Sequence, residues 1–432
     1  MEIYYDYIQM NITTYPTSAK GEITAPPSKS YSQRAVAAAL LAEGETVIRN
    51  IADCDDVRAS MRVIAKLGAD IYNEENSVGI KGVGGSYGIN PEAKYINCVE
   101  SGLCLRMFSA IAALSDKEIE LRTEGSLSIR PVNYIGKSLE QLGAKFSSDE
   151  DFPPITVKGP LLGGEAEIDG SAGSQFLSGL LIALPLCKND SHLTVRNLKS
   201  KFYIDMTIDT LAQFGVELSH NDYKEFYVSG GQKYSASNFT VEGDWSGAST
   251  ILTAGAIAGD VSVKGLNPNS IQPDRAILTV LESAGAEIEI DNKIVSVRQS
   301  ELQAFDFDAT HCPDLFPALT VLAINCSGTS RIKGVSRLIN KESDRGAALP
   351  EEFNKLGAKI SVDGDYMLIE GSSLAGGTAS SHNDHRIAMA LAVAAFNSEN
   401  PIVIQDSECV NKSYPNFFAD LQSVGMRTEE RL

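Results

Sequence analysis

The 432-residue sequence lacks the features that mark several classes of protein. It contains no uninterrupted apolar run approaching the roughly 20 residues that a membrane-spanning helix needs, so no membrane protein is expected. The N-terminal stretch MEIYYDYIQMNITTYP lacks the basic start and apolar core of a secretory signal. The seven cysteines are odd in number and include no Cys-x-x-Cys pair, which argues against a disulfide framework or a structural zinc site. We therefore expect a cytoplasmic protein.

An excess of positive charge is also missing. The sequence has 37 Lys and Arg residues against 56 Asp and Glu residues, which gives a formal net charge of -19. A surface that binds a nucleic-acid duplex needs an excess of basic residues, so nucleic acid is not an expected partner. The five histidines show no metal-ligating spacing. Neither a metal nor a cofactor is expected.

What the sequence does contain is a short pattern repeated at a nearly constant interval. A glycine between two apolar residues ends a stretch of helical periodicity six times, at Gly68, Gly143, Gly215, Gly285, Gly357 and Gly425. The intervals are 75, 72, 70, 72 and 68 residues. Glycine just past a helix end supplies the left-handed turn that closes the helix, so a single occurrence is generic. Six occurrences at this spacing predict one structural unit used six times.

Each unit is expected to run strand, helix, strand, helix, strand, strand. Residues 31–42 of the first unit are Ala- and Leu-rich and apolar nearly all round, which predicts a buried helix. This helix recurs at 105–114, 176–186, 249–259, 315–326 and 386–396. A second helix, expected at 56–67, has one apolar stripe. Buried helices must be surrounded by other elements. We therefore expect an α/β fold of two similar domains, each with three repeats whose parallel buried helices are walled by sheets, divided near residues 241–243.

Polar and cationic residues recur near the starts of these nearly uncharged helices. They include Lys29, Ser30, Arg34, Ser101, Gly102, Arg106, Gly173, Ser174, Gln175, Asp314, Lys341, Arg345, His385 and Arg386, and Lys412 follows the last of the strands that succeed a buried helix. A helix N-terminus favours anions through its unpaired N–H groups and its partial positive charge. Cations are disfavoured there unless an anionic ligand joins them. The pattern predicts a focus of positive charge that binds multiply charged small anions.

Each of these residues also has a structural interpretation. A single Lys or Arg at a helix start is more often a solvated surface residue, and Ser30 or Ser101 can be a plain N-cap. Asp314 and Asp384 are equally good caps. The acids of the second helix of the first unit, Asp53, Asp55 and Asp56, are most simply interpreted as first-turn caps. Recurrence at equivalent positions of the repeat favours the binding interpretation for the cations.

Three motifs carry a resemblance to a known family. They are Pro27-Ser28-Lys29-Ser30 followed by Arg34, the stretch 341–345 (KESDR), and the stretch 383–386 (NDHR). Together they resemble the 5-enolpyruvylshikimate-3-phosphate synthases, the 3-phosphoshikimate 1-carboxyvinyltransferases of the shikimate pathway, and the likeness runs essentially end to end. The resemblance implies the enolpyruvyl transferase fold, with three βαβαββ repeats per domain. It implies one domain at 27–240, mainly for shikimate 3-phosphate, and another at 1–26 plus 241–432, mainly for phosphoenolpyruvate.

The resemblance also implies a role for each candidate residue. Lys29 would lie between the two substrates, and Gln175 would touch both. The residues expected to hold shikimate 3-phosphate are Ser30, Arg34, Ser174, Ser200 and Tyr203. At Gly173 the phosphate donor has to come from the backbone or is missing. Those expected around phosphoenolpyruvate are Gly102, Arg130, Arg345, Arg386 and Lys412. Arg106 and Lys341 are added as substrate-binding candidates because they lie near helix starts. Asp314, Glu342 and His385 match the acid–base residues.

The implied reaction adds the shikimate 5-hydroxyl to C2 of phosphoenolpyruvate and then eliminates phosphate. Asp314 is expected as the base toward the hydroxyl, and Glu342 and Lys29 are candidates for protonating the methylene carbon. The arginines would position the substrates and stabilise charge. The expected partners are the two small-molecule substrates alone, and the chain is expected to act as a monomer.

The sequence departs from the family pattern at four positions. Gly173 stands where the family often has Ser, and Arg337 stands where several members have Asn. Leu103 and Met107 replace the Thr and Pro that many members carry around the glycine–arginine motif. Because this segment shapes the phosphoenolpyruvate pocket, the departures bear on the response to the inhibitor glyphosate.

Three alternative functions are weaker matches. An enolpyruvyl transferase acting on UDP-N-acetylglucosamine shares the fold but carries a cysteine in the loop before an Arg-Pro pair, whereas residues 125–129 before Arg130 and Pro131 contain none. Cys104 is interpreted as a core residue. A non-catalytic anion-binding repeat protein would be expected to have lost one of Lys29, Asp314, Glu342 or Lys412. An RNA-end-processing enzyme on a related fold is disfavoured by the net charge of -19.

Overall fold

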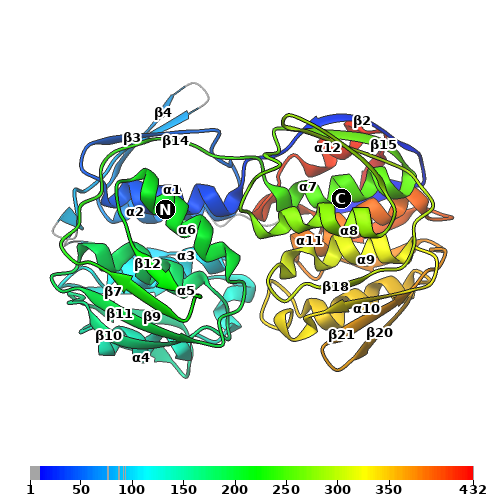
Figure 1. Cartoon of the computed structure of the whole chain (residues 1–432). Coiled ribbons are helices and arrows are strands. Elements are labelled where there is room, and N and C mark those ends of the chain that lie inside the picture. The colour runs from blue at the N-terminus through cyan, green and yellow to red at the C-terminus, as the bar shows by residue number, and fades with distance from the viewer. Residues whose placement is uncertain (1–9, 75–76, 86–87, 91, 93, 432) are drawn as a thin grey trace. The chain divides into compact units, whose positions relative to one another are not determined.

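The computed structural model describes residues 10–74, 77–85, 88–90, 92 and 94–431 (Figure 1). The first nine residues, which contributed to the expectation of no secretory signal, lie outside this described part. The chain divides into two compact units. One is formed by Pro27–Glu242, and the other by Met1–Pro26 together with Gly243–Leu432. We refer to them as the continuous unit and the split unit.

The boundary after Glu242 falls within the expected region at 241–243, although it lies two residues past the end of the domain expected at 27–240. Backbone and side-chain hydrogen bonds explain the difference. The Val241 N–H donates to the Arg49 carbonyl (3.0 Å), and the Asn50 side chain donates to the Val241 carbonyl (2.8 Å). The Ser28 N–H donates to the Glu242 carbonyl (2.8 Å). These bonds keep residues 241 and 242 with the continuous unit.

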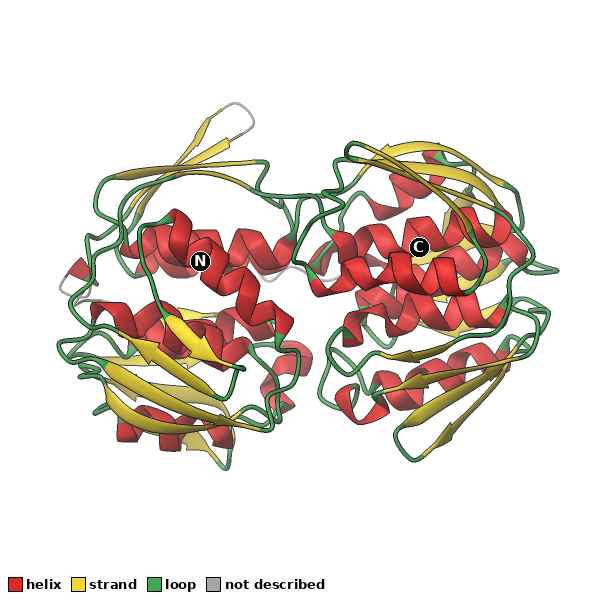
Figure 2. Ribbon diagram, viewed as in Figure 1, coloured by secondary structure: helices red, strands yellow, loops and turns green. Residues whose placement is uncertain are grey.

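The sheets of the continuous unit each contain four strands within the described residues. Their strand orders are β14 (Asn238–Thr240), β3 (Glu45–Arg49), β5 (Ser77–Lys81), β4 (Asp70–Glu74); β6 (Tyr95–Asn97), β7 (Glu118–Arg122), β9 (Phe152–Lys158), β8 (Lys145–Asp149); and β10 (Gly164–Asp169), β11 (Ser191–Arg196), β13 (Glu225–Val228), β12 (Ser219–Asn221). Each sheet covers the helices of the unit on one side, as Figure 2 shows.

The sheets of the split unit have the same size. Their strand orders are β2 (Ala19–Thr24), β15 (Gly259–Lys264), β17 (Ile294–Arg298), β16 (Glu287–Asp291); β18 (Asp306–Asp308), β19 (Thr329–Lys333), β21 (Tyr366–Glu370), β20 (Lys359–Asp363); and β22 (Gly377–Ser380), β23 (Ile402–Gln405), β1 (Asn11–Tyr15), β24 (Arg427–Arg431).

All of these sheets repeat one pattern. In the orders given above, the first two strands are parallel, and the third and fourth are each antiparallel to the strand before them. In four of these sheets the parallel pair is joined by a crossover that a buried helix provides. The antiparallel strands follow the second helix of the repeat, with the exception of β1. The expected α/β fold, with three βαβαββ repeats in each of two similar units, is confirmed.

In each unit, the first strand of one repeat comes from a distant part of the chain, so that β2 and β14 are exchanged between the units. β2 precedes the first buried helix in the chain, yet it pairs with β15 of the split unit, Ile23 lying opposite Val263. The place of β2 in the continuous unit is taken by β14, in which Phe239 lies opposite Ile48 of β3. A third distant strand, β1, lies between β23 and β24. The chain therefore passes between the units twice, at Pro26–Pro27 and at Glu242–Gly243.

The apolar helices predicted from the sequence form the centre of each unit. They are α1 (Lys29–Leu41), α3 (Gly102–Ala112) and α5 (Gln175–Ala183) in the continuous unit, and α7 (Trp245–Ala258), α9 (Phe316–Ile324) and α11 (His385–Ala394) in the split unit. Every residue of α7, α9 and α11 is buried. α3 packs against α5, and α9 packs against both α7 and α11.

The second helices of the repeats have an apolar stripe and an exposed face. They are α2 (Asp55–Lys66), α4 (Asn133–Gln141), α6 (Phe202–Gln213), α8 (Ile277–Ser283), α10 (Arg345–Lys355) and α12 (Phe417–Ser423). In α2 the predicted stripe faces the core: Val57 and Ile64 are buried, as is Leu67 just past the helix, and Met61 is half-buried.

The six repeated glycines follow these helices. All six have a positive φ, between +78° at Gly215 and +112° at Gly68. An L-residue disfavours this left-handed region because its Cβ approaches the backbone, whereas glycine has no Cβ. The repeat interval seen in the sequence is therefore the interval between helix-terminating turns.

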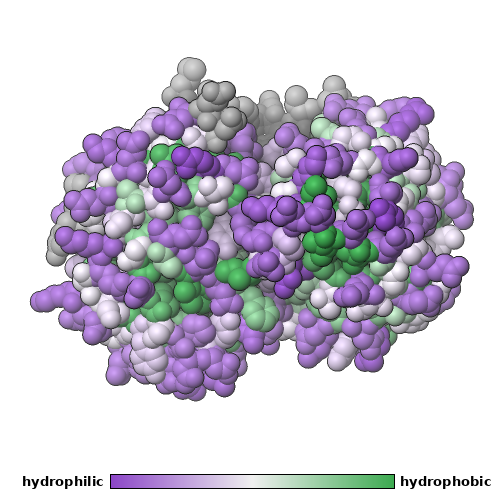
Figure 3. All heavy atoms as spheres, turned by 45° about the horizontal axis from the view of Figure 1, so that its top comes forward, coloured by the Kyte–Doolittle hydropathy of each residue, from purple (hydrophilic) through white to green (hydrophobic). Residues whose placement is uncertain are grey.

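The face of the molecule drawn in Figure 3 is mainly polar. Hydrophilic residues cover most of the face shown in Figure 3, and hydrophobic residues lie in smaller groups among them. Among the described residues, every helix is too short or too polar to span a lipid bilayer.

Replacing one repeated glycine tests the role of the left-handed turn. Gly285 has φ +86°, and a Cβ built there would approach only the Glu301 carbonyl oxygen, at 3.5 Å. Gly285→Ala should therefore lower the free energy of unfolding by about 1 kcal/mol, and the cause is the backbone conformation. Gly285→Asn should cost less, because asparagine adopts left-handed geometry more readily. We expect the thermal unfolding midpoints to rank parent, then Asn, then Ala, and equal midpoints for the two variants would contradict this account.

Candidate active site

Most of the predicted site residues lie at the starts of the buried helices. Lys29, Gly102 and Gln175 are the first residues of α1, α3 and α5. The residues immediately before these helices are serines in all three cases: Ser28, Ser101 and Ser174. The recurrence seen in the sequence thus corresponds to one structural position.

Two of these serines act as N-caps. The Ser28 hydroxyl accepts from the Tyr31 N–H (3.5 Å), and the Ser101 hydroxyl accepts from the Cys104 N–H (3.4 Å). The cap of α1 is thus Ser28, whereas Ser30 lies inside the helix. Ser174 is buried and makes no side-chain hydrogen bond to α5. Its hydroxyl therefore does not satisfy the orphan N–H groups at the start of that helix.

Arg34 is a buried cation held by neutral oxygens. Its guanidinium donates to the carbonyls of Ser30 (2.9 Å) and Tyr203 (3.2 Å), and to the hydroxyls of Thr207 (2.9 Å) and Ser178 (3.4 Å). Among the described residues, no carboxylate forms a salt bridge with it. Burial lowers the pKa of Arg34 to about 10. An anion nearby would offset this desolvation, so Arg34 is suited to binding one.

Arg106 and Gly102 form a second candidate anion-binding element. The Arg106 guanidinium donates to the Gly102 carbonyl (3.1 Å), the Gln175 side-chain oxygen (3.1 Å) and the Tyr134 hydroxyl. A Cβ at Gly102 would lie 2.6 Å from Arg106 Nη1 and 3.4 Å from Arg130 Nη1. A side chain at position 102 would therefore require the Arg106 guanidinium to shift from its place beside the start of α3.

Arg130 follows the 3₁₀ turn Gly125–Ile129 and is also buried. Its Nη2 donates to the Ser126 hydroxyl at 3.1 Å. Cys104, on α3, is fully buried as expected.

Lys29 differs from Arg34 because it is paired with an acid. Its Nζ donates to Asp56 Oδ2 at 2.9 Å, and both side chains are largely buried. Asp56 was expected as a plain first-turn cap of α2, so its carboxylate has a further role. Asp53 pairs instead with Arg58 on the surface (2.7 Å). α2 itself starts without a side-chain cap.

The remaining candidates of the continuous unit lie on two loops and one helix. Gly173 has φ +129°, and Ser200 is a buried residue with φ +54°. Tyr203, in the first turn of α6, packs against the core of the unit. Its carbonyl accepts from Arg34, so this part of α6 is fixed to α1.

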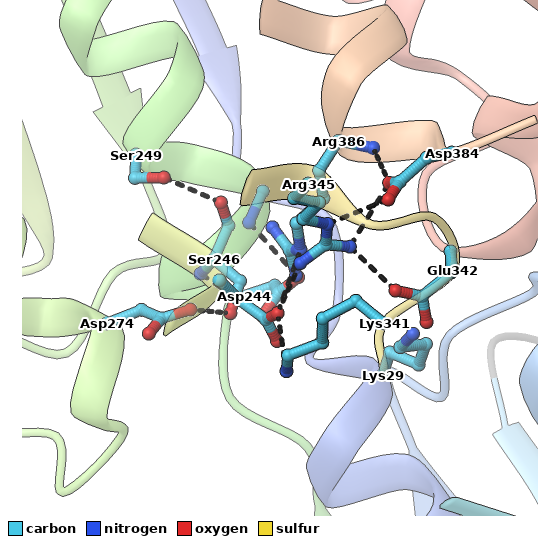
Figure 4. A network of polar contacts seen from close by, with 12 residues as sticks. Lys29, Asp244, Ser246, Ser249, Asp274, Lys341, Glu342, Arg345, Asp384 and Arg386 are labelled. Carbon is cyan, nitrogen blue, oxygen red and sulfur yellow. Dashed lines mark hydrogen bonds and ion pairs between the residues drawn. The ribbon is translucent and has the colours of Figure 1, made fainter. Parts of the chain in front are cut away.

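The candidates of the split unit form an ion network around Arg345, which is fully buried (Figure 4). Arg345 Nη1 donates to Asp314 Oδ1 and Nη2 donates to Glu342 Oε2, both at 2.7 Å. Asp384 takes two bonds, from Nε at 2.7 Å and from Nη2 at 3.1 Å. These three carboxylates raise the pKa of Arg345 well above its usual range despite burial. One guanidinium thus fixes three acids.

Asp314 accepts from more than one cation. Its Oδ1 lies 3.1 Å from Lys341 Nζ and 3.9 Å from Arg386 Nε. Burial lowers the pKa of Lys341, although Asp314 opposes that shift. The negative charge of Asp314 is the main reason that the pKa of Arg386 is raised in spite of its burial. Asp314 was also considered as a helix cap, but its carboxylate serves this ion network.

The start of α11 gathers the other candidates. Asp384 caps the helix by accepting from the Arg386 N–H (2.9 Å), which agrees with its capping interpretation. Its carboxylate also forms the ion pair with Arg345. His385 is the first residue of α11 and is buried. Lys412, at the end of the 3₁₀ segment Ser407–Lys412, donates to the Asn383 carbonyl at 2.8 Å.

The sequence analysis missed Asp274, a fully buried acid. It accepts from the Ser246 hydroxyl through Oδ2, and its Oδ1 has no hydrogen-bond partner among the described residues. A signal was present: Pro273-Asp274 and Pro313-Asp314 each open a 3₁₀ turn with the same dipeptide. Burial and the Asp314 charge raise the pKa of Asp274 to about 7.

Comparisons with known proteins agree on one family. The chain matches the family model for EPSP synthase (3-phosphoshikimate 1-carboxyvinyltransferase) over residues 13–421. The 3-phosphoshikimate 1-carboxyvinyltransferase of Clostridium novyi (strain NT) is 38% identical over 423 residues, covering 96% of this chain and 97% of the relative. That of Clostridium perfringens (strain 13 / Type A) is 39% identical over 413 residues, covering 95% and 97%. A solved structure of EPSP synthase from Acinetobacter baumannii aligns with a TM-score of 0.82 at 26% identity, covering 98% of this chain and all of that one.

The buried carboxyl of Asp274 makes stability depend on pH. Its ordinary pKa is 3.8, so between about pH 4 and about pH 7 the unfolded chain releases a proton that the folded chain retains, and stability falls as pH rises. Asp274→Asn keeps an acceptor for Ser246 without titrating. Its thermal midpoint should exceed that of the parent at about pH 8, and the difference should shrink at about pH 4.5. An equal difference at both pH values would show that Asp274 does not titrate in this range.

Proposed function

Because the chain belongs to the EPSP synthase family, we propose that it transfers the enolpyruvyl group of phosphoenolpyruvate to the 5-hydroxyl of shikimate 3-phosphate and releases phosphate. The observation that carries this proposal is the match to the family model across residues 13–421. The retained acids and cations of both units support it. Their individual roles below are part of the proposal.

We propose that the continuous unit binds shikimate 3-phosphate mainly through α1, α5 and α6. The residues assigned to it are Lys29, Ser30, Arg34, Gly173, Ser174, Gln175, Ser200 and Tyr203. Arg34 supports the assignment because its buried charge is held by neutral groups and gains from an anionic ligand. Ser174 supports it because its buried hydroxyl makes no bond to its own helix.

Gly102, Arg106 and Arg130 are assigned to phosphoenolpyruvate. Two guanidinium groups that approach a helix start form a strong site for phosphate or carboxylate, because charge-assisted bonds add to the unpaired N–H groups. Lys341, Arg345, Arg386 and Lys412 are assigned to the same substrate. Of these, Arg345 is already surrounded by carboxylates, so its main effect is to orient them.

The acids of the Arg345 network supply the proton transfers. Asp314 takes the proton of the 5-hydroxyl while that oxygen forms a bond to C2 of phosphoenolpyruvate, and the methylene carbon gains a proton from Glu342 or Lys29. Elimination returns the carbon proton and breaks the bond between C2 and the phosphate oxygen, so that phosphate leaves. Proton transfer by a positioned group contributes about 100-fold or more to rate. The ion pairs with Arg345 hold the carboxyl groups of Asp314 and Glu342 in fixed positions.

The chain is further proposed to act as a monomer in the cytoplasm. All seven cysteines are free and buried, which suits a reducing compartment.

The decisive assay measures phosphate release from phosphoenolpyruvate in the presence and absence of shikimate 3-phosphate. Release is expected only when both substrates are present. UDP-N-acetylglucosamine and unphosphorylated shikimate, each offered in place of shikimate 3-phosphate, should give little or none. Release with the nucleotide sugar instead would overturn the proposed substrate.

Glu342→Gln separates an acid–base role from a structural one. Glutamine still accepts from Arg345 but cannot carry the carbon proton, so kcat should fall about 100-fold or more while the KM values change little. Glu351→Gln, an exposed change on α10, is the matched control and should leave kcat unchanged. Unchanged kcat with weaker substrate binding in Glu342→Gln would make Glu342 a structural partner of Arg345.

Gly102→Ala tests the second anion-binding element. The new methyl group would lie 2.6 Å from Arg106 Nη1, so the guanidinium must move away from the Gly102 carbonyl. We expect a higher KM for phosphoenolpyruvate, much weaker inhibition by glyphosate and partial retention of kcat. Titrations of inhibitor against parent and variant measure this. Equal inhibition of the two proteins would show that glyphosate does not lie against Gly102.

A further inference from the structure

The turn that precedes α11 has an unfavourable backbone conformation. His382 and Asn383 have φ values of +52° and +53°, in the left-handed region that residues other than glycine seldom adopt. Two successive residues of this kind persist only when surrounding contacts hold them. The residues that follow directly are Asp384, His385 and Arg386, so the turn sets where the start of α11 lies.

The contacts that hold the turn come from Glu352, on α10. Its carboxylate is 1% exposed. Glu352 Oε2 accepts from the Ser380 N–H (3.0 Å), at the end of β22, and Oε1 lies 2.7 Å from His382 Nε2. The turn is closed from inside by the Ser380 hydroxyl, which accepts from the His382 N–H at 3.0 Å. One buried carboxylate therefore binds both Ser380 and His382, the residues with which the turn begins.

A metal ion is not needed to explain this cluster. Ligand atoms of Glu351, Glu352 and His382 lie within 4.8 Å of one another, a spacing that could hold a cation. However, the Lys355 ammonium donates to both carboxylates, at 2.9 Å to Glu351 and 2.8 Å to Glu352. Lys355 therefore provides the positive charge at this position.

The other side of the turn contacts two assigned site residues. The Asn383 carbonyl accepts from Lys412 Nζ at 2.8 Å. Asp384 binds Arg345, which starts the helix that carries Glu352 about two turns later. α10 is thus joined to the segment 380–384 at two places, by Arg345 near its start and by Glu352 further along.

We propose that Glu352 is a positioning residue for the reaction: by fixing Ser380 and His382, it orients the Asn383 carbonyl toward Lys412 and keeps that ammonium in place for phosphoenolpyruvate. The inference rests on the proposed function of Lys412. Glu352 touches no substrate in this account and acts through the turn alone. Its loss should therefore weaken the use of phosphoenolpyruvate and leave shikimate 3-phosphate binding as it is.

The test compares Glu352→Ala with Glu351→Ala, which removes a neighbouring carboxylate that binds the same Lys355 but makes no hydrogen bond to the turn among the described residues. We expect Glu352→Ala to raise the KM for phosphoenolpyruvate about tenfold, with the KM for shikimate 3-phosphate unchanged, and Glu351→Ala to change neither. Glu352→Gln should recover most of the loss, because its amide oxygen can still accept from the Ser380 N–H. If Glu352→Ala does not fold, His382→Ala takes its place as the test variant, because His382 is at a partly exposed position. It should change the KM values in the same direction.

Repeating the substitution in the Lys412→Ala variant tests whether Glu352 acts on the KM for phosphoenolpyruvate through Lys412. In Lys412→Ala, adding Glu352→Ala should cause almost no further rise in the KM for phosphoenolpyruvate, because the two residues act through one contact. Hydrogen exchange of the peptide covering 377–390 should quicken in Glu352→Ala and not in Glu351→Ala, a readout that needs no activity. Equal KM rises with and without Lys412, or unchanged exchange, would overturn the inference. Failure of the parent to use the two substrates would overturn the proposed function instead.

Discussion

The split unit depends on the buried guanidinium of Arg345. The three carboxylates that it binds come from separate segments: the 3₁₀ turn with Asp314, the segment before α10 with Glu342, and the cap of α11 with Asp384. Each of these acids is positioned by the same cation, so moving any of them breaks an ion pair with a fully buried guanidinium. Breaking a buried ion pair on one side costs about 3–5 kcal/mol. The proposed acid–base groups are therefore placed by electrostatics, and the helices of the fold serve to bring that single cation to them.

The two units use the same repeat for different purposes. In the continuous unit, serines precede the buried helices, and Arg34 and Arg106 are held by neutral oxygens. In the split unit, Asp244 and Asp384 cap the corresponding helices, and the cations face carboxylates. Cations without acidic partners gain most from an anionic ligand, whereas acids fixed by cations are held in the defined geometry that proton transfer requires. The helix starts that the repeat provides are thus common to both units, and a few side chains decide which chemistry each start supports.

Features set by local sequence were predicted well. The apolar runs predicted the buried helices, and the six glycines predicted the left-handed turns, because both depend on neighbouring residues only. Helix starts were less accurate: α7 begins at Trp245 rather than at 249, because Asp244 caps a first turn that precedes the expected apolar run. Pairing between distant residues could not be predicted. A concentrated basic focus was expected, but the sequence does not tell which acids meet which cations, so the pairs of Lys29 with Asp56 and of Arg345 with Asp314 were missed. The exchange of β2 and β14 is also a pairing across the length of the chain.

That exchange sets the order in which the units can be completed during synthesis. The continuous unit has all its strands once residue 242 has left the ribosome. The split unit does not, because β2 has to wait for β15, about 235 residues later, which is ~10–50 s at ordinary rates of translation. β1 waits longer still, since β24 lies at the end of the chain. The first strands made are thus among the last to be paired, and they spend that interval as unpaired edges tethered to a domain that is already able to fold. A nascent chain of this kind is exposed to wrong pairing at its N-terminus for most of its synthesis.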